Sequence, residues 1–248
     1  MTALSVEGLC KTYPSFTLDH VSFTLERGRI MGLIGKNGAG KSTTLKSILN
    51  LVSSDAGRIE LLGLPFPEEE TACKQKTGVV LGGIDFYQHR RLEEITDVTR
   101  RFYRVWDQPG YERYLKEFEL DPRKRVKELS AGMRVKYLIA LALSHGAELF
   151  IFDEPTSGLD PVSRDELLEL FRELVKGGTR SILFSTHITS DLEKCADDIT
   201  YIKTGKVLAS AEKSVFLESF QHLRTAEDAG ALSLEEIMVR TERREFHV

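Results

Sequence analysis

The stretch GKNGAGKS, residues 35–42, decides the fold of this chain. Its glycine, four further residues, second glycine, lysine and serine form the pattern of a phosphate-binding loop. Glycines let such a backbone turn its N–H groups inward and approach phosphate oxygens closely. We expect Lys41 to reach the terminal phosphates of a nucleotide and the Ser42 hydroxyl to bind Mg²⁺. The other residues predicted to contact the nucleotide are Gly35, Lys36, Asn37, Gly38, Ala39, Gly40 and Thr43.

The residues flanking this loop predict a strand before it and a helix after it. Residues 4–34 alternate apolar and polar side chains in short runs that lead into a buried strand. Residues 41–52, KSTTLKSILNLV, carry apolar side chains at helical spacing. We expect this helix to stop in the cluster SSDAG at 53–57, where Gly57 supplies an end signal.

The rest of the chain changes character twice. From about Leu92 to His145, charged and aromatic residues at helical spacing predict a helical insertion, with helical segments at 92–106, at 110–120 and from about Arg134. Strand and helix signals then alternate, which predicts a mostly parallel sheet with helices on both faces. The expected elements are a strand at 149–154, helices at 163–177 and 189–198, a strand at 181–187 and a hairpin at 199–210.

Composition and charge exclude several classes of protein. The net charge of −4 gives no reason to expect nucleic acid as a partner, and we interpret RKRVK at 123–127 as a solvated loop. No apolar run approaches the roughly 18–20 residues that cross a bilayer, and the N-terminus lacks a secretory pattern. The cysteines Cys10, Cys73 and Cys195 are far apart and have no metal-ligand spacing, which favours a reducing compartment.

Two carboxylates end the apolar strand LFIFDE at 149–154. A strand that ends in acids beside a phosphate loop is typical of a magnesium site. Because side chains alternate along a strand, Asp153 and Glu154 should point to different sides and have different roles. We expect Asp153 to face the metal and Glu154 to hold and activate the attacking water.

These motifs occur in the order GKNGAGKS, LSAGM at 129–133, LFIFDEPTSGLD at 149–160 and STH at 185–187. In this order and spacing the sequence resembles the nucleotide-binding subunit of an ATP-binding cassette (ABC) transporter over nearly its whole length. LSAGM matches the signature loop of that family, usually LSGGQ, and keeps Ser130 and Gly132. The resemblance implies that this loop contacts the γ-phosphate of ATP bound to the opposite subunit. A serine hydroxyl and free N–H groups at a helix start suit an anion.

Other positions take their expected roles from the same resemblance. Tyr13 would stack on adenine, although a tyrosine in a strand is also an ordinary core residue. Asp160 would link the two subunits. His187 would contact the γ-phosphate and orient the attacking water as a second catalytic residue beside Glu154.

One family feature is missing from the sequence. After the strand TGVVL at 77–81, the family has a glutamine that touches Mg²⁺ and water, whereas this chain has Gly82 or Gly83 there, and Gln88 lies too far along. We hypothesise that water or Asp85 takes this role. ATPase assays of Gly82→Gln and Asp85→Ala would test it, and unchanged activity and magnesium dependence in both would exclude it.

The expected fold is an α/β phosphate-loop NTPase core with a mostly parallel sheet, an antiparallel β subdomain and an inserted α-helical subdomain. Residues 1–248 would form one ABC ATPase domain. Within it, about 1–91 and 146–211 form the catalytic core, about 92–145 the helical subdomain, and about 212–248 a C-terminal extension. Most aromatic residues at 102–118 would pack inside the helical subdomain, and part could line a groove for a helix of a membrane subunit.

The resemblance implies an ATP-binding and hydrolysing subunit of a membrane transporter, with ATP as substrate and Mg²⁺ as cofactor. Its partners would be a second ABC ATPase subunit, in a homodimer or heterodimer, and an integral membrane permease. The permease would hold it on the cytoplasmic face of the cell membrane. SLEEIMV at 233–239 resembles the end of subunits from bacterial ABC-2-type exporters, which favours export.

Two other classes of protein are alternatives. A soluble ABC protein in translation, repair or regulation usually carries two cassettes or a long coiled-coil insertion, and neither is visible in the sequence. A phosphate-loop kinase or GTPase is disfavoured because the guanine-reading NKxD motif is missing and because LSAGM would have no role.

Overall fold

The computed structural model describes residues 1–81, 87–225, 228 and 230–243 of the chain. The described strands are β1 (Thr2–Tyr13), β2 (Phe16–Glu26), β3 (Ile30–Ile34), β4 (Ala56–Leu61), β5 (Leu64–Phe66), β6 (Thr77–Val80), β7 (Leu149–Asp153), β8 (Ser181–Thr186), β9 (Asp198–Lys203) and β10 (Lys206–Glu212). The helices are α1 (Lys41–Ile48), α2 (Glu70–Gln75), α3 (Leu92–Thr99), α4 (Gln108–Glu117), α5 (Ala131–Ser144), α6 (Pro161–Val175), α7 (Thr189–Cys195), α8 (Lys213–Ser219) and α9 (Leu234–Glu242). Short 3₁₀ turns cover Arg100–Phe102, Val126–Glu128 and Gln221–Leu223.

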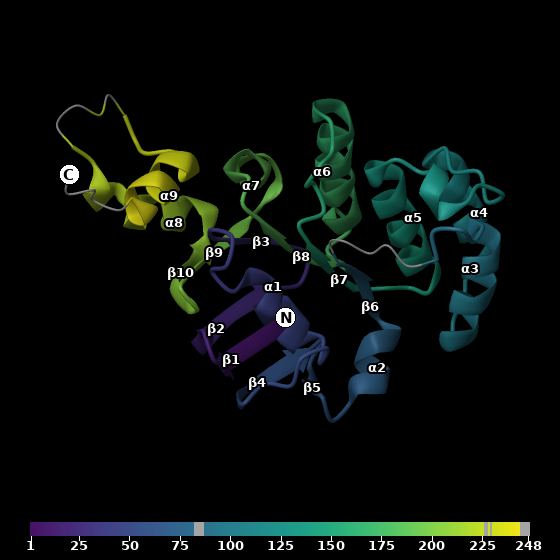
Figure 1. Ribbon diagram of the computed structural model, residues 1–248, viewed down its shortest axis with the longest axis horizontal. Coiled ribbons are helices and arrows are strands. Elements are labelled where there is room, and N and C mark those ends of the chain that lie inside the picture. The colour runs from purple at the N-terminus through teal and green to yellow at the C-terminus, as the bar shows by residue number, and fades with distance from the viewer. Residues whose placement is uncertain (82–86, 226–227, 229, 244–248) are drawn as a thin grey trace.

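Two sheets organise the chain (Figure 1). The larger sheet has the order β10-β9-β3-β8-β7-β6, and its neighbours pair in parallel except for β10 with β9. The smaller sheet is antiparallel, with the order β2-β1-β4-β5. Together with the helices, they confirm the predicted fold class of a mostly parallel core with an antiparallel β subdomain. Among the described residues, no helix is both long and apolar enough to cross a membrane.

The larger sheet is buried on both faces, which explains the unbroken apolar sequence of its central strands. Along β7, Phe150 and Phe152 pack in one hydrophobic cluster, whereas Leu149 and Ile151 pack in the other. Phe171 of α6 closes on Phe152 with ring centroids 4.9 Å apart. Burying such side chains stabilises the fold by about 1.5–3 kcal/mol each. The sheet therefore holds the carboxyl ends of β3, β7 and β8 rigidly side by side.

The helices α3, α4 and α5 lie together at one end of the molecule (Figure 1). A buried network of hydroxyl groups joins them, because Thr96 Oγ1 lies 2.7 Å from Tyr111 OH and 2.9 Å from Tyr137 OH. Tyr137 OH also donates to the carbonyl oxygen of Leu92 at 3.0 Å. This arrangement confirms the predicted helical insertion.

Two local expectations were wrong. The helix α1 ends at Ile48 rather than near Gly57, and Asn50 then turns the chain with a φ of 53°. Gly57 lies inside β4, where an added Cβ would be 2.6 Å from Leu9 Cα, so this glycine permits close contact between strands. Residues 100–106 do not continue α3, because Tyr103 leaves the helix and stacks on His145 with ring centroids 3.7 Å apart.

Candidate active site

The phosphate loop joins the end of β3 to the start of α1, as the sequence predicts. Gly40 has a φ of 117°, which a residue with a side chain rarely adopts. A Cβ at Gly40 would also lie 2.7 Å from Leu18 Cδ2 and 2.9 Å from Phe16 Cζ. Glycine is therefore required here both by the backbone angle and by the β1–β2 hairpin packed against the loop.

Lys41 is held inside this loop. Its side chain is only 5% exposed, and Nζ donates to the carbonyl oxygen of Gly35 at 2.7 Å and to that of Lys36 at 3.3 Å. Nζ also lies 3.3 Å from Glu154 Oε1. Because this side chain is already fixed, its ammonium group can bind phosphate oxygens with little further loss of conformational entropy.

The turn between β9 and β10 ties the loop to the smaller sheet. The N–H of Gly205 donates to the carbonyl oxygen of Ala39 at 2.9 Å, and the Gly205 carbonyl accepts from the N–H of Asp19 in β2 at 2.8 Å. The phosphate loop and the antiparallel sheet are therefore bonded to the same residue.

Asp153 ends β7 beside the loop and is 7% exposed. The hydroxyl of Ser42 donates to Asp153 Oδ1 at 3.1 Å, so the two residues predicted to bind Mg²⁺ do lie together. Oxygen ligands of this kind suit Mg²⁺, and the pair fits such an ion. Ser185 Oγ donates to the same carboxylate oxygen at 2.5 Å.

Ser185 was missed in the sequence. It pairs directly with Asp153 across the parallel strands β7 and β8. Its hydroxyl also accepts from the N–H of Glu154 at 3.0 Å, so this one serine orients both carboxylate residues. The signal that the sequence offers is weak: Ser185 is one of two adjacent hydroxyl residues that follow the apolar run ILF in the strand SILFST.

Glu154 and His187 meet at the same edge of the sheet. His187 Nδ1 donates to Glu154 Oε2 at 2.8 Å, and the Glu154 side chain also faces Lys41. Glu154 has a φ of 50°, a left-handed conformation that costs about 1–3 kcal/mol and is common at functional sites. Asp153 contacts Ser42 and Ser185, whereas Glu154 contacts Lys41 and His187.

A pocket of about 580 Å³ lies over these side chains. It is lined by Lys36, Asn37, Gly38, Gly40, Lys41, Ser42, Thr43, Glu154 and His187 among the predicted residues, and also by Ser15, Phe16 and Ser157. Tyr13 does not line it. Tyr13 is 37% exposed, pairs with Phe16 across the hairpin, and has Lys11 Nζ 5.7 Å from its ring centroid.

The signature loop lies outside this pocket. Ser130 begins α5 and accepts from the N–H of Met133 at 3.2 Å, while the buried Gly132 packs near Ser163. Asp160 begins α6 and accepts from the N–H groups of Val162 and Ser163 at 3.0 and 3.1 Å. Hydrogen bonding by the Ser163 side chain, together with these N–H groups, holds the pKa of Asp160 below its usual value. The structure does not bring Ser130, Gly132 or Asp160 to the pocket of their own chain.

The expected position of the missing glutamine, with Gly82, Gly83 and Asp85, lies outside the described residues. Gln88 is described, and its carbonyl oxygen accepts from the N–H of Lys127 at 3.0 Å.

Comparisons with known proteins agree with this geometry. The family model described as "ABC transporter" matches residues 18–157. The chain is 37% identical over 228 residues to the ABC-type transporter ATP-binding protein EcsA of Bacillus subtilis (strain 168), covering 89% of this chain and 91% of that protein. It is 32% identical over 210 residues to the bacitracin transport ATP-binding protein BcrA of Bacillus licheniformis, covering 84% of this chain and 69% of that protein.

A solved structure of the ATP-binding subunit of an ABC transporter superimposes with a TM-score of 0.82. It is 31% identical, and the match covers 97% of this chain and 100% of that one.

Proposed function

Because the chain belongs to the ABC transporter family of ATP-binding proteins, we propose that it binds MgATP, hydrolyses it and so drives export through a membrane partner. The observation that carries this proposal is the convergence of Lys41, Glu154 and His187 on one pocket. The relatives include proteins named for bacitracin transport and for Nod factor export, which favours an exporter.

The geometry supports a role for each of these residues. Lys41 and the loop N–H groups hold the phosphates, while Ser42 and Asp153 would hold Mg²⁺, which neutralises phosphate charge when bound. Glu154 accepts the proton of the attacking water, and His187 keeps that carboxylate oriented. Ser185 positions Asp153 and the Glu154 backbone.

We propose that the second half of each site comes from another chain. Ser130 and Ala131 are exposed at the start of α5, where free N–H groups suit an anion, and Gly132 is buried beside them. Within the part of the chain that the structure describes, none of the three lines the nucleotide pocket of its own chain. A face-to-face dimer would supply this helix start with the phosphates of the partner's ATP. The residues of this chain suffice for a homodimer.

The rate of ATP hydrolysis per chain should therefore depend on protein concentration. Below the dimer dissociation constant, the specific rate should fall steeply as the sample is diluted, because neither site is complete in a monomer. ATPase assays with parallel sedimentation measurements would check this. An unchanged rate in demonstrably monomeric samples would refute the shared site.

A groove on the helical subdomain supports the proposal of a membrane partner. It has a volume of about 550 Å³ and is lined by Ile95, Val98 and Phe102 together with polar side chains. Val98 is 54% and Phe102 72% exposed. We propose that a short helix of a permease packs its apolar face here.

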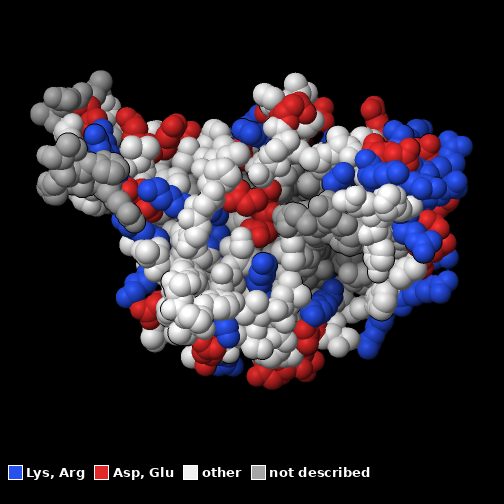
Figure 2. Space-filling view, in the orientation of Figure 1, with Lys and Arg blue, Asp and Glu red and all other residues white. Residues whose placement is uncertain are grey.

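Basic side chains surround this groove, and three of them, Arg90, Arg91 and Arg100, pair with acidic residues of α3. Figure 2 shows Lys and Arg side chains gathered over the end of the molecule that α3, α4 and α5 form. Such charge suits the anionic cytoplasmic leaflet of a membrane, which supports location on that face. The exposed basic residues there include Arg90, Arg91, Arg100, Arg101 and Arg104.

Phe102→Asp should weaken binding of the membrane partner about tenfold or more, since a charge would replace an apolar anchor of the groove. The ATPase activity of the isolated chain should not change. Co-purification of integral membrane proteins with the tagged chain measures this effect. Val105→Asp is the control, because Val105 is 67% exposed but does not line the groove. Equal recovery of the partner by both variants would argue against this docking site.

We also keep the proposed division of the chain into a catalytic core at about 1–91 and 146–211, a helical subdomain at about 92–145 and an extension at about 212–248. In the extension, α8 packs against β9 and β10, and α9 packs against α7. These contacts support an extension that belongs to the same domain.

A further inference from the structure

The end of the C-terminal helix α9 contacts the phosphate loop. Lys36 Nζ donates to the carbonyl oxygen of Glu242 at 3.3 Å and lies 3.8 Å from Glu242 Oε2. Lys36 is the second residue of the loop and lines the nucleotide pocket. A cation at the rim of a phosphate site is thus paired with a carboxylate from 206 residues away in the sequence.

Glu242 is fixed in this position by β9. Tyr201 OH donates to Glu242 Oε1 at 2.9 Å, and the Glu242 side chain is only 11% exposed. Lys203 Nζ donates to the neighbouring carbonyl oxygen of Thr241 at 2.6 Å. Burial and the bond to Glu242 raise the pKa of Tyr201, so its hydroxyl remains a donor.

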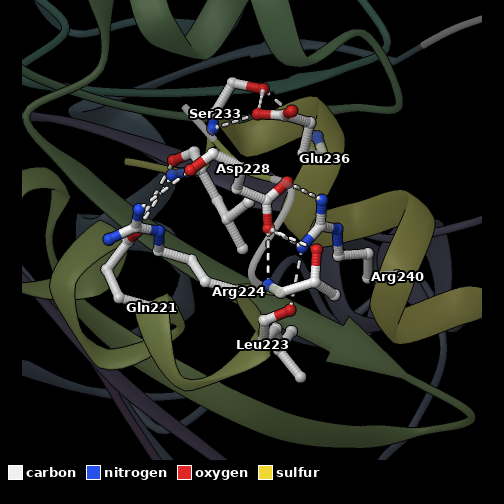
Figure 3. A network of polar contacts seen from close by, with 9 residues as sticks. Gln221, Leu223, Arg224, Asp228, Ser233, Glu236 and Arg240 are labelled. Atoms are coloured by element: carbon white, nitrogen blue, oxygen red, sulfur yellow. Dashed lines mark hydrogen bonds and ion pairs between the residues drawn. The ribbon is translucent and has the colours of Figure 1, made fainter. Parts of the chain in front are cut away.

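The other side of α9 is braced by the segment before it (Figure 3). Arg240 pairs with Asp228 through two hydrogen bonds and also donates to the carbonyl oxygen of Leu223 at 2.9 Å. Ser233 and Glu236 cap the start of the helix by exchanging hydrogen bonds. Because both ends are tied, Glu242 is not a fraying helix terminus.

A second hollow runs between α9 and residues 187–190, with a volume of about 970 Å³. It shares Lys36 and His187 with the nucleotide pocket. Lys36 therefore stands on the wall between the two hollows, with Glu242 on one side and the phosphate site on the other.

We propose that Glu242 is a positioning residue for ATP binding, which holds Lys36 away from the nucleotide so that phosphate and the C-terminal helix compete for one ammonium group. This inference rests on the proposed binding of ATP. Its physical basis is that one ammonium cannot make its best contacts with a carboxylate and a phosphate on opposite sides. Linkage makes the effect reciprocal, so bound ATP should loosen α9 as much as α9 weakens ATP.

Glu242→Gln is the variant that isolates the charge. Glutamine keeps an oxygen for Tyr201 and leaves the backbone carbonyl of residue 242 in place, but it removes the attraction for Lys36 and the repulsion of phosphate. We expect a non-hydrolysable ATP analogue to bind about three- to fivefold more tightly, because the interaction free energy of a partly exposed ion pair corresponds to a change in affinity of this size. The gain should shrink at high salt. The KM for ATP should fall while kcat stays the same.

Three further variants control this measurement. Glu242→Asp keeps the charge and should bind the analogue like the unmodified chain. Glu235→Gln removes a charge from the same helix and the same hollow, but not from the pair with Lys36, and should have no effect. Lys36→Met should weaken binding of the analogue. When Glu242→Gln is added to Lys36→Met, the increase in affinity for the analogue should be much smaller than the increase that Glu242→Gln causes in the chain with Lys36.

The reciprocal effect is measured by hydrogen exchange of residues 234–242 in the full chain. Their amides should exchange faster with the analogue bound than without it. Equal or weaker analogue binding by Glu242→Gln, or unchanged exchange in α9, would overturn the competition while leaving the proposed function intact. Failure of the unmodified chain to bind the analogue would instead refute the proposed function.

Discussion

Glu154→Gln should lower the rate of ATP hydrolysis by about 10²–10⁴-fold, the range of a general base, while ATP remains bound. The amide has the shape of the carboxylate and can still contact His187, which lies 2.8 Å from Glu154 Oε2. It cannot take a proton from water. It also removes a negative charge beside the phosphate site, so affinity for ATP should not fall.

Single-turnover hydrolysis and equilibrium binding of ATP separate these two effects. Glu166→Gln is a matched control, because Glu166 is an exposed acid of α6 that pairs with Lys136 away from the pocket. The base assignment fails if Glu154→Gln hydrolyses ATP at the rate of the control. It also fails if ATP no longer binds, since the carboxylate would then have served the phosphate site and not the water.

Two inactive variants should restore activity when they are mixed. Lys41→Ala removes the buried ammonium from the nucleotide pocket, and Gly132→Asp places a negative charge on the signature loop of the same chain. Neither homodimer contains a complete site, because each carries the same defect in both of its chains. In a mixed dimer, the intact pocket of the Gly132→Asp chain faces the intact signature loop of the Lys41→Ala chain.

An equal mixture should therefore regain up to about a quarter of the original activity, because half of the dimers are mixed and each has one complete site. The first atom of the new side chain fits at Gly132, since an added Cβ would meet Ser163 Cβ at 3.5 Å, an ordinary contact, and circular dichroism of the variant checks that it folds. Subunit exchange followed by an ATPase assay measures the recovery. Persistent inactivity in a mixture shown to contain mixed dimers would contradict the shared site.

The sequence predicted those parts of the site that neighbouring residues specify. The phosphate loop, the strand before it and the helix after it are local, so their pattern fixed Gly40, Lys41 and Ser42. Alternation along one strand predicted different directions for Asp153 and Glu154, but Glu154 follows the end of β7 with a φ of 50°, so the turn after the strand and not the strand itself directs its side chain. The α/β class followed because repeated strand and helix signals require a parallel sheet.

The parts that could not be predicted depend on contacts between distant elements. Ser185 acts through its register opposite Asp153, which no local pattern specifies. Phe16 reaches the pocket because the β1–β2 hairpin packs on the loop, whereas Tyr13, which the resemblance favours, does not line that pocket. The contact between Lys36 and Glu242 requires the C-terminal extension to return to the phosphate loop.

The bonds of Gly205 have a consequence for how the nucleotide leaves. That turn bonds the phosphate loop at Ala39 and the antiparallel sheet at Asp19, and Phe16 beside it lines the pocket. The phosphate loop and the hairpin that carries Phe16 are thus coupled through one residue and should move together. In the proposed dimer, exit of spent nucleotide should accordingly proceed by separation of the two chains and not by loosening within either one.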